Sequence, residues 1–186
     1  QLDAGYHWSS DGGTTHPFRD QGLQVPTLEQ VLARFPQQHM IIELKSDGQA
    51  MAEQLCGLLR AHNHQERSIV ASFHDDALTF FREACPEVAT SASSSEAAYY
   101  WILHVLRLDL LSSPDFEALL IPETAGPITI VDQRFVDVSQ TRGLPVQVWT
   151  IDEEQDMRRL TRLGVHAIIT PQPDRLMGLL QELGQR

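Results

Sequence analysis

The chain has little cysteine, more acid than base, and no apolar stretch long enough to cross a membrane. It contains 2 cysteines among 186 residues and carries a formal net charge of -11. The longest apolar stretch, 97–111, is interrupted by His104, Arg107 and Asp109, whereas a membrane helix needs about 18 apolar residues. The negative charge argues against a nucleic-acid partner, because phosphates need a basic surface. A small phosphate ester stays compatible, since a local cation or metal outweighs the global field.

Export signals and nucleotide-binding glycine loops are also missing. No basic segment followed by an apolar one opens the chain, so a cytoplasmic location is expected over a periplasmic one. Gly12-Gly13 and Gly48 lie in polar loops without a preceding strand, which excludes a dinucleotide-binding motif. Cys56 and Cys85 are not in metal-ligand spacing, and we expect buried free thiols rather than a disulfide.

Helical and strand patterns alternate from residue 25 to the end of the chain. Strands are predicted at 39–45, 68–73, 88–91, 119–121, 146–150 and 165–170, and helices at 28–35, 51–59, 75–85, 95–107, 132–142, 153–163 and 173–183. Thr27 with Gln30 predicts a capping box, and Asp152 is expected to cap a later helix with Gln155 at its third position. Gly164 is expected to close that helix. Such alternation indicates a parallel sheet, either doubly wound or a barrel.

Residues 1–24 differ from the rest, because they are polar, rich in Gly, Ser, Thr and Asp, and free of strand patterns. We interpret them as a long loop or insertion and residues 25–186 as βα units of a single domain. At 42% hydrophobic residues the chain can bury one substantial core. His7 and His16 fall in this loop, where the alternatives are a solvated position and the rim of a site.

The stretch 41–45 places a carboxylate and an ammonium inside an apolar strand. Side chains alternate along a strand, so Glu43 and Lys45 share one face while Ile42 and Leu44 share the other. Charges that point into a protein are costly unless they are paired or bind an ion or substrate. The pair therefore predicts a site, with a fraying strand end or an internal ion pair as the alternatives.

Polar and aromatic side chains recur where the predicted strands end. They are Glu43 and Lys45, Ser72 and His74, Thr90 and Ser91, Glu123, Trp149 and Thr150, and Thr170. Active sites of barrels and open α/β sheets assemble at this edge. Two of these residues have structural alternatives, because His74 could cap a helix and Glu123 could be a charged residue of a loop. His62 and His64 are expected in a solvated turn, and Trp101 in the core or an interface.

Several segments, in this order, are similar to those of the glycerophosphodiester phosphodiesterase family. They are DAGYHWSSDGGTTHPFRDQGLQVPTLEQVL, IIELK, SIVASF, VQVWTID and GVHAIITPQPD. The resemblance implies a TIM-type (β/α)8 barrel that hydrolyses small-molecule glycerophosphodiesters to sn-glycerol 3-phosphate and an alcohol, with a divalent cation, Ca²⁺ or Mg²⁺. It places Glu43 as a metal ligand and Lys45 as a phosphate contact, which suits hard oxygen ligands and a developing phosphoryl charge. Phe73, Trp149 and Glu123 would then bind substrate.

The chain also departs from the family's pattern. Asp152 replaces the usual Asn after the Trp-Thr signature, and Pro171 replaces an Asp. The family's His-Arg-Gly, Glu-x-Asp and His-Asp motifs, which supply the acid/base histidines and further metal ligands at the start of the barrel, do not occur ahead of the first predicted strand of this sequence. The pair His74-Asp75 and the triplet Glu154-Gln155-Asp156 lie far from that position. We therefore expect about six of eight barrel strands, with the first two lacking and the chain inactive by itself. A phospholipase C- or D-like barrel and a degenerate, non-catalytic binding module are the alternatives, and a homo-oligomer is possible.

Overall fold

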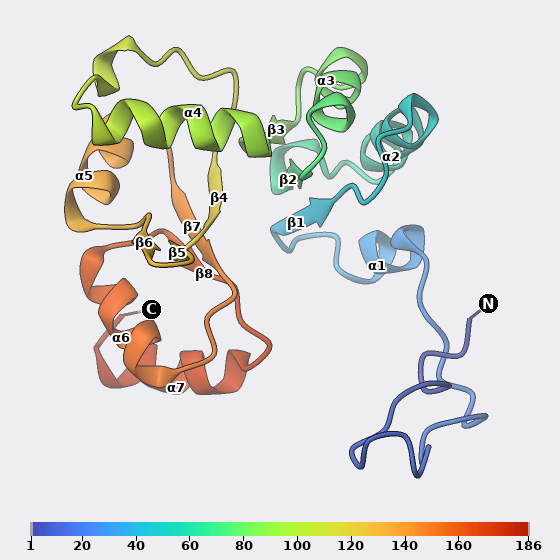
Figure 1. Cartoon of the computed structure of the whole chain (residues 1–186). Helices are drawn as coiled ribbons and strands as arrows, with labels where there is room; N and C mark the ends of the chain where they lie inside the picture. Colours follow the sequence, from blue (N-terminus) through green and yellow to red (C-terminus); the bar gives the residue numbers. More distant parts are fainter. Residues whose placement is uncertain (1, 186) are drawn as a thin grey trace.

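The structure is a computed structural model that describes residues 2–185. Helices and strands alternate along most of it (Figure 1). The α-helices are α1 Leu28–Arg34, α2 Gln49–Ala61, α3 Asp75–Ala84, α4 Ser94–Val105, α5 Gln133–Thr141, α6 Glu154–Leu163 and α7 Pro173–Glu182. The strands are β1 Met40–Glu43, β2 Ser68–Ala71, β3 Ala89–Thr90, β4 Leu119–Pro122, β5 Thr124–Ala125, β6 Ile128–Thr129, β7 Val146–Trp149 and β8 Ala167–Ile168. Short 3-10 turns occupy Gln65–Arg67 (η1) and Asp109–Leu111 (η2). Each predicted helix and strand is present within a few residues of its expected bounds.

Six of the strands form a parallel series in chain order. β1, β2 and β3 make one sheet, and β4, β7 and β8 make another, with every pairing parallel. A parallel bridge between Ser91 and Ala118 joins the two, and the Ala92 N–H donates to the Ala118 carbonyl at 2.9 Å. The predicted parallel α/β architecture is confirmed. The series does not close into a barrel within residues 2–185, where β1 and β8 are its outer strands. That two further strands complete it stays a prediction.

Buried apolar side chains form two clusters rather than the one core expected from composition. The first core packs α1, α2 and α3 against β1 and β2, and it includes Leu59, Val70 and Phe81. The second core packs α4 to α7 against β4, β7 and β8, and it includes Val148 and Met157. Polar residues between the two sheets separate the clusters, as described below.

The capping predictions had mixed outcomes. Thr27 and Gln30 form the expected capping box at the start of α1, and Gly164 ends α6 in the left-handed conformation. The prediction for Asp152 was wrong, because Glu153 is the N-cap residue of α6 and makes no side-chain cap bond. The Ile151 N–H still pairs with the Ile169 carbonyl at 3.1 Å. The backbone therefore keeps its sheet-like pairing up to Ile151, and the helix begins later than the sequence suggested.

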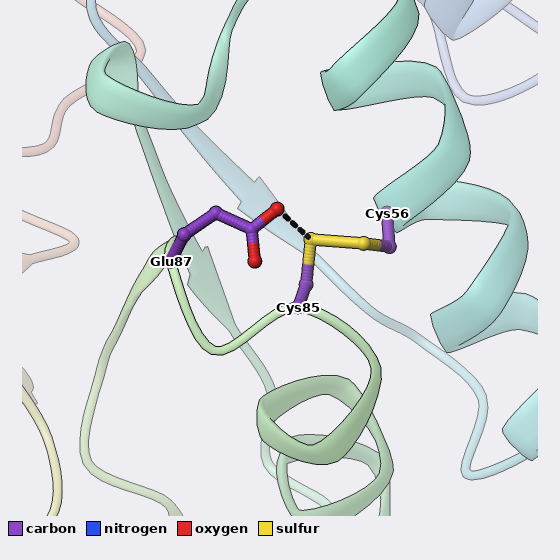
Figure 2. Close-up of side chains that lie close together, drawn as sticks. All are labelled: Cys56, Cys85 and Glu87. Carbon is purple, nitrogen blue, oxygen red and sulfur yellow. Dashed lines mark hydrogen bonds between the residues drawn. A yellow bond between two sulfur atoms is a disulfide. The ribbon is translucent and has the colours of Figure 1, made fainter.

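The expectation of free thiols was wrong, because Cys56 and Cys85 form a disulfide. Cys56 lies in α2 and Cys85 is the C-cap of α3, two helices that pack side by side (Figure 2). Their Cα atoms are 5.6 Å apart, within the range that disulfide geometry requires. Glu87 lies next to the bond and pairs with Arg60 at 2.6 Å. Both sulfur atoms are committed to each other, so this cluster is not a metal site.

Residues 2–25 extend away from the strands as a long loop (Figure 1). An isolated antiparallel bridge between Asp3 and Gln24 closes its base. Within it, the Asp11 carboxylate accepts bonds from Ser9 and from the backbone and hydroxyl of Thr15, which lowers the pKa of Asp11 to about 2. None of the helices within residues 2–185 is long and apolar enough to span a bilayer.

Candidate functional site

A cavity of about 820 Å³ opens at the carboxyl ends of the parallel strands. The inward-facing residues of β1, β2, β4 and β7 form its floor, because alternate residues of those strands pack into the two cores on the opposite face. The start of α4 and the β5–β6 hairpin form its sides. Most of the lining side chains are apolar, such as Ile41, Leu120, Ile128 and Ile169. This is the edge at which the sequence predicted a site.

Glu43 and Lys45 lie on one wall of the cavity and face the same way, as alternation predicts. The Lys45 Nζ lies 2.6 Å from the Glu43 Oε1. The side chain of Glu43 is 31% exposed and that of Lys45 is 75% exposed, so the expected burial of both charges was wrong. Glu43 is the last residue of the outer strand β1, Lys45 follows two residues beyond it, and the inner face of β1 borders the open cavity. An ion pair this exposed contributes little to stability, which leaves both groups free for a ligand.

The end of β1 is held in place by Ser72 at the end of β2. The Ser72 hydroxyl donates to the Leu44 carbonyl at 2.8 Å, and the Leu44 N–H donates to the Ala71 carbonyl at 2.8 Å. The same hydroxyl accepts a bond from the His74 N–H at 3.0 Å. Ser72 is buried and lines the cavity. It therefore fixes the backbone between the two charged residues of the site.

Phe73 and Trp149 make an aromatic wall beside the charged pair. Their rings meet edge to face with centroids 5.5 Å apart, although they come from the ends of β2 and β7. The Lys45 Nζ lies 5.8 Å from the centre of the Phe73 ring, within range of a cation–π contact. The structure thus brings together Glu43, Lys45, Phe73 and Trp149, four of the five residues that the sequence singled out.

The fifth residue, Glu123, is not brought to the cavity. It follows β4, and its carboxylate pairs with Arg159 of α6. Its backbone carbonyl accepts the Ile130 N–H at 2.9 Å, which closes the loop around the hairpin. Within the described residues, Glu123 is thus placed as the charge of a loop rather than as a group that touches the cavity.

None of the histidines of residues 2–185 lines the cavity. His74 is the exposed N-cap residue of α3, and His16 bonds the Trp8 carbonyl within the first loop. The prediction that His64 lies in a solvated turn was wrong, because its ring is fully buried and its Nε2 lies 3.2 Å from the Phe35 carbonyl oxygen. A general acid or base for the cavity is therefore not supplied by a histidine of this part of the chain.

The sequence reading missed the contribution of α4 and the hairpin. Ala97 and Trp101 of α4 and Ile128 of β6 line the cavity. The hydroxyls of Ser93 and Ser95 lower the pKa of Asp75 in α3, and the Ser95 hydroxyl donates to Asp75 at 2.8 Å. This contact ties the start of α4 to α3 beside the cavity. The capping box at Ser93 and Glu96 was the available signal.

A parallel α/β series with a charged and aromatic site at its carboxyl edge is the arrangement of α/β barrels and open sheets. Comparison with known families identifies which family of such proteins the chain belongs to. The profile of the glycerophosphoryl diester phosphodiesterase family matches residues 7–175. The chain belongs to this family, as its sequence motifs indicated.

Relatives and solved structures agree with this assignment. The chain is 25% identical to a glycerophosphodiester phosphodiesterase of Caldanaerobacter subterraneus, over 94% of this chain and 69% of that protein. It is 29% identical to a glycerophosphodiester phosphodiesterase of Bacillus subtilis, over 82% of this chain and 53% of that protein. The fold matches the glycerophosphoryl diester phosphodiesterase domain of a Mycobacterium tuberculosis protein with a TM-score of 0.78 and 18% identity, over 98% of this chain and 72% of that chain. The chain thus spans about half to two thirds of the length of these two curated relatives.

Proposed function

We propose that the chain carries the phosphate-binding side of a hydrolase that cleaves glycerophosphodiesters to sn-glycerol 3-phosphate and an alcohol. The observation that supports this function is the Glu43–Lys45 pair at the carboxyl edge of the sheet, facing a cavity large enough for such a substrate. Family membership and the names of the relatives agree with it.

Lys45 would contact the phosphate of the substrate. Its side chain is largely exposed and lines the cavity. The ammonium has three donors, so its pairing with Glu43 leaves donors for an anion. The net charge of the chain is -11, so a local cation is needed where a phosphate is to bind. We propose that this is the role of Lys45 rather than that of a structural ion-pair partner.

Glu43 would hold a divalent cation, Ca²⁺ or Mg²⁺, together with the substrate phosphate. Its donor atoms suit such an ion, because hard cations take carboxylate oxygens and Mg²⁺ is often bound by one or two carboxylates plus substrate phosphate. Within residues 2–185, no cluster of three metal-ligating side chains includes Glu43. A bound cation would stabilise negative charge on the phosphoryl oxygens. Glu43 and Lys45 would orient the phosphate, and Phe73 with Trp149 would pack against the glycerol or the alcohol.

The chain alone is expected not to turn over, because no histidine of residues 2–185 reaches the cavity. The test compares the 186-residue chain with a longer polypeptide that also carries the family's His-Arg-Gly and Glu-x-Asp motifs. Release of sn-glycerol 3-phosphate from glycerophosphocholine is measured with Ca²⁺, with Mg²⁺ and with EDTA. Cation-dependent release by the longer polypeptide alone supports the proposal. Release by the shorter chain would contradict the expected inactivity.

The roles of the charged pair are tested in the active polypeptide. Glu43→Gln is expected to cost about 3 kcal/mol of transition-state stabilisation, since it weakens a catalytic metal. Lys45→Met should reduce activity while cation affinity stays near that of the parent. Glu83→Gln is the matched control, because Glu83 is exposed on α3 away from the cavity. Unchanged turnover and cation dependence in Glu43→Gln would exclude Glu43 as a ligand, and a loss of folding in Lys45→Met would mark Lys45 as structural.

A non-catalytic binding module is the second candidate, favoured by the missing histidine at the cavity. Titration calorimetry of the 186-residue chain with sn-glycerol 3-phosphate measures binding, and together with the release assay it distinguishes a binding module from an enzyme. Binding that Lys45→Met abolishes, without release by either polypeptide, would identify a binding module. Binding together with release by the longer polypeptide would identify the enzyme.

A further inference from the structure

Helix α4 and the segment that follows it expose a continuous set of large apolar side chains. We name this set the α4–η2 patch, and it consists of Tyr99, Ile102, Val105, Leu106, Leu108, Leu110 and Leu111. Leu110 is 90% exposed and Leu111 is 67% exposed. Large exposed apolar patches are rare on soluble monomers and often functional. A single exposed leucine would need no explanation, but seven within thirteen positions do.

The exposed side of α4 has an unusual composition for a surface helix. One side packs into the second core through Tyr100, Leu103 is also buried, and a second side lines the cavity through Ala97 and Trp101. The third side is left to solvent, and a helix normally places charged residues there. In α4 that side carries Tyr99, Ile102 and Val105 instead, and Figure 1 shows no other element lying in front of the helix.

Within the segment that carries the patch, exposed acidic side chains are absent although the chain is strongly acidic. Between residues 97 and 113 the charged side chains are Arg107, which is exposed, and Asp109, which is buried. Asp109 is neutralised by Arg134 and lies 3.1 Å from the Nδ1 of His104. Beyond that segment, Arg134 and the exposed Asp132 line the smaller cavity beside Arg107 and Val105. The charges that border the patch there are therefore two cations and one carboxylate, within a chain of net charge -11. That distribution fits a surface of lipid with phosphate headgroups, which repels carboxylates and accepts an arginine at the edge of an apolar contact.

The patch also continues into the cavity. Trp101 lines the main cavity and, together with Arg107 and Arg134, a smaller cavity of about 170 Å³ next to the patch. Ala98 is exposed on α4 between the patch and the main cavity, which it also lines. A second copy of the chain seated on the patch would cover this side of the cavity. A lipid surface would instead place the cavity next to lipid molecules, and a tyrosine suits that interface because its body is apolar and its hydroxyl polar.

We propose that the α4–η2 patch docks the protein on a lipid surface, with Leu110 and Leu111 inserted among the lipids and Arg107 at their phosphates. The proposal goes beyond the proposed function and does not depend on it, because docking requires no turnover. Its consequence is that lipids and lipid-derived phosphodiesters would be concentrated beside the cavity.

The test is flotation of the 186-residue chain with phosphatidylcholine vesicles, with and without a minor share of phosphatidylglycerol. The double variant Leu110→Asn/Leu111→Asn removes two side chains that make few contacts in the folded protein. Its affinity for vesicles is expected to fall at least tenfold, since a leucine moved from water into lipid loses the transfer free energy of its side chain when replaced by a polar one. Met177→Asn is the matched control, because Met177 is an exposed apolar residue of α7 outside the patch. It should bind as the parent does.

Three results would overturn the proposal. The parent chain does not float with either vesicle, or the double variant floats as well as the parent, or Met177→Asn loses as much affinity as the double variant. Light scattering of the parent and the double variant accompanies the flotation. A parent dimer that the double variant dissociates, with no flotation of the parent, would assign the patch to a second copy of the chain.

Discussion

The two cores of the molecule are held together by different means. The first core, around α2 and α3, is closed by a covalent bond between Cys56 and Cys85. The second core has no such bond, and instead buries a charged group, in which Asp109 contacts His104 and pairs with Arg134. The stability of the two halves should therefore depend on different agents. The first is sensitive to reductant and the second to the loss of a charge.

A polar seam lies between the two cores. Arg82 of α3 donates both terminal nitrogens to the Glu96 carboxylate of α4, at 2.7 and 3.0 Å. Its Nε donates to the Thr90 hydroxyl at 2.9 Å, and its Nη2 to the Ser91 carbonyl at 3.1 Å. One guanidinium, carried by α3 of the first half, thus bonds both α4 of the second half and the end of strand β3.

Removing the buried carboxylate should have the largest effect. Asp109→Ala leaves the guanidinium of Arg134 without its partner in a mostly buried position, and such a loss costs about 3–5 kcal/mol. Urea unfolding should show this decrease, and amide hydrogen exchange should rise at Val148 and Met157 before it rises at Val70. Asp115→Ala, at an exposed position, should stay within about 0.5 kcal/mol of the parent. Equal protection of both cores in Asp109→Ala would show that they unfold as one unit.

Breaking the disulfide should lower the free energy of unfolding somewhat less, and the effect should appear in the first core. The bond closes a loop between residues 29 positions apart, which corresponds to about 3.6 kcal/mol in the chain-entropy treatment. Cys56→Ala/Cys85→Ala should lose that amount, with exchange rising first at Val70 and Phe81. Reductant should destabilise the parent by a similar amount and leave the double variant unchanged. A double variant as stable as the oxidised parent would contradict this assignment.

Weakening the polar seam should have the smallest effect on the free energy of unfolding. Burial raises the pKa of Glu96, but hydrogen bonds from Arg82 and Ser93 outweigh it and the pKa is lowered from its ordinary value of 4.5. A carboxyl with a lowered folded pKa adds stability above pH 4.5 that is lost as the pH falls through the folded pKa. Glu96→Gln weakens these charge-assisted hydrogen bonds and should cost about 2 kcal/mol at neutral pH. The difference from the parent should shrink in acid, and a constant difference down to low pH would refute the pair's contribution.

The fold was largely predictable from the sequence, and the site in part. Apolar periodicity located the elements, and alternation along 41–45 placed Glu43 and Lys45 on one face. Contacts between distant segments left no local signal. The disulfide required α2 to meet α3, and the pairing of Glu123 with Arg159 required α6 to reach the loop after β4. The side of the cavity made by Trp101 likewise depends on how α4 crosses the strands.

The disulfide bears on the expected location of the protein. Disulfides persist in oxidising compartments and are rare where thiols are kept reduced. A cytoplasmic location stays a prediction, and the redox state of the Cys56–Cys85 pair in the isolated protein would test it. Mass determination of protein isolated from each compartment, with thiols blocked during lysis, would decide between a cytoplasmic and a periplasmic location.

Lys45 gives the site a property that its neighbours do not have. It is the single lysine of the sequence, and its ammonium is largely exposed beside Glu43. Amine-directed acylation of the side chains of this protein therefore reports on one position, at the wall of the cavity. The rate of that labelling can be followed by mass spectrometry as phosphate esters are added. It measures how far the site is occupied, and it requires neither catalysis nor a substitution.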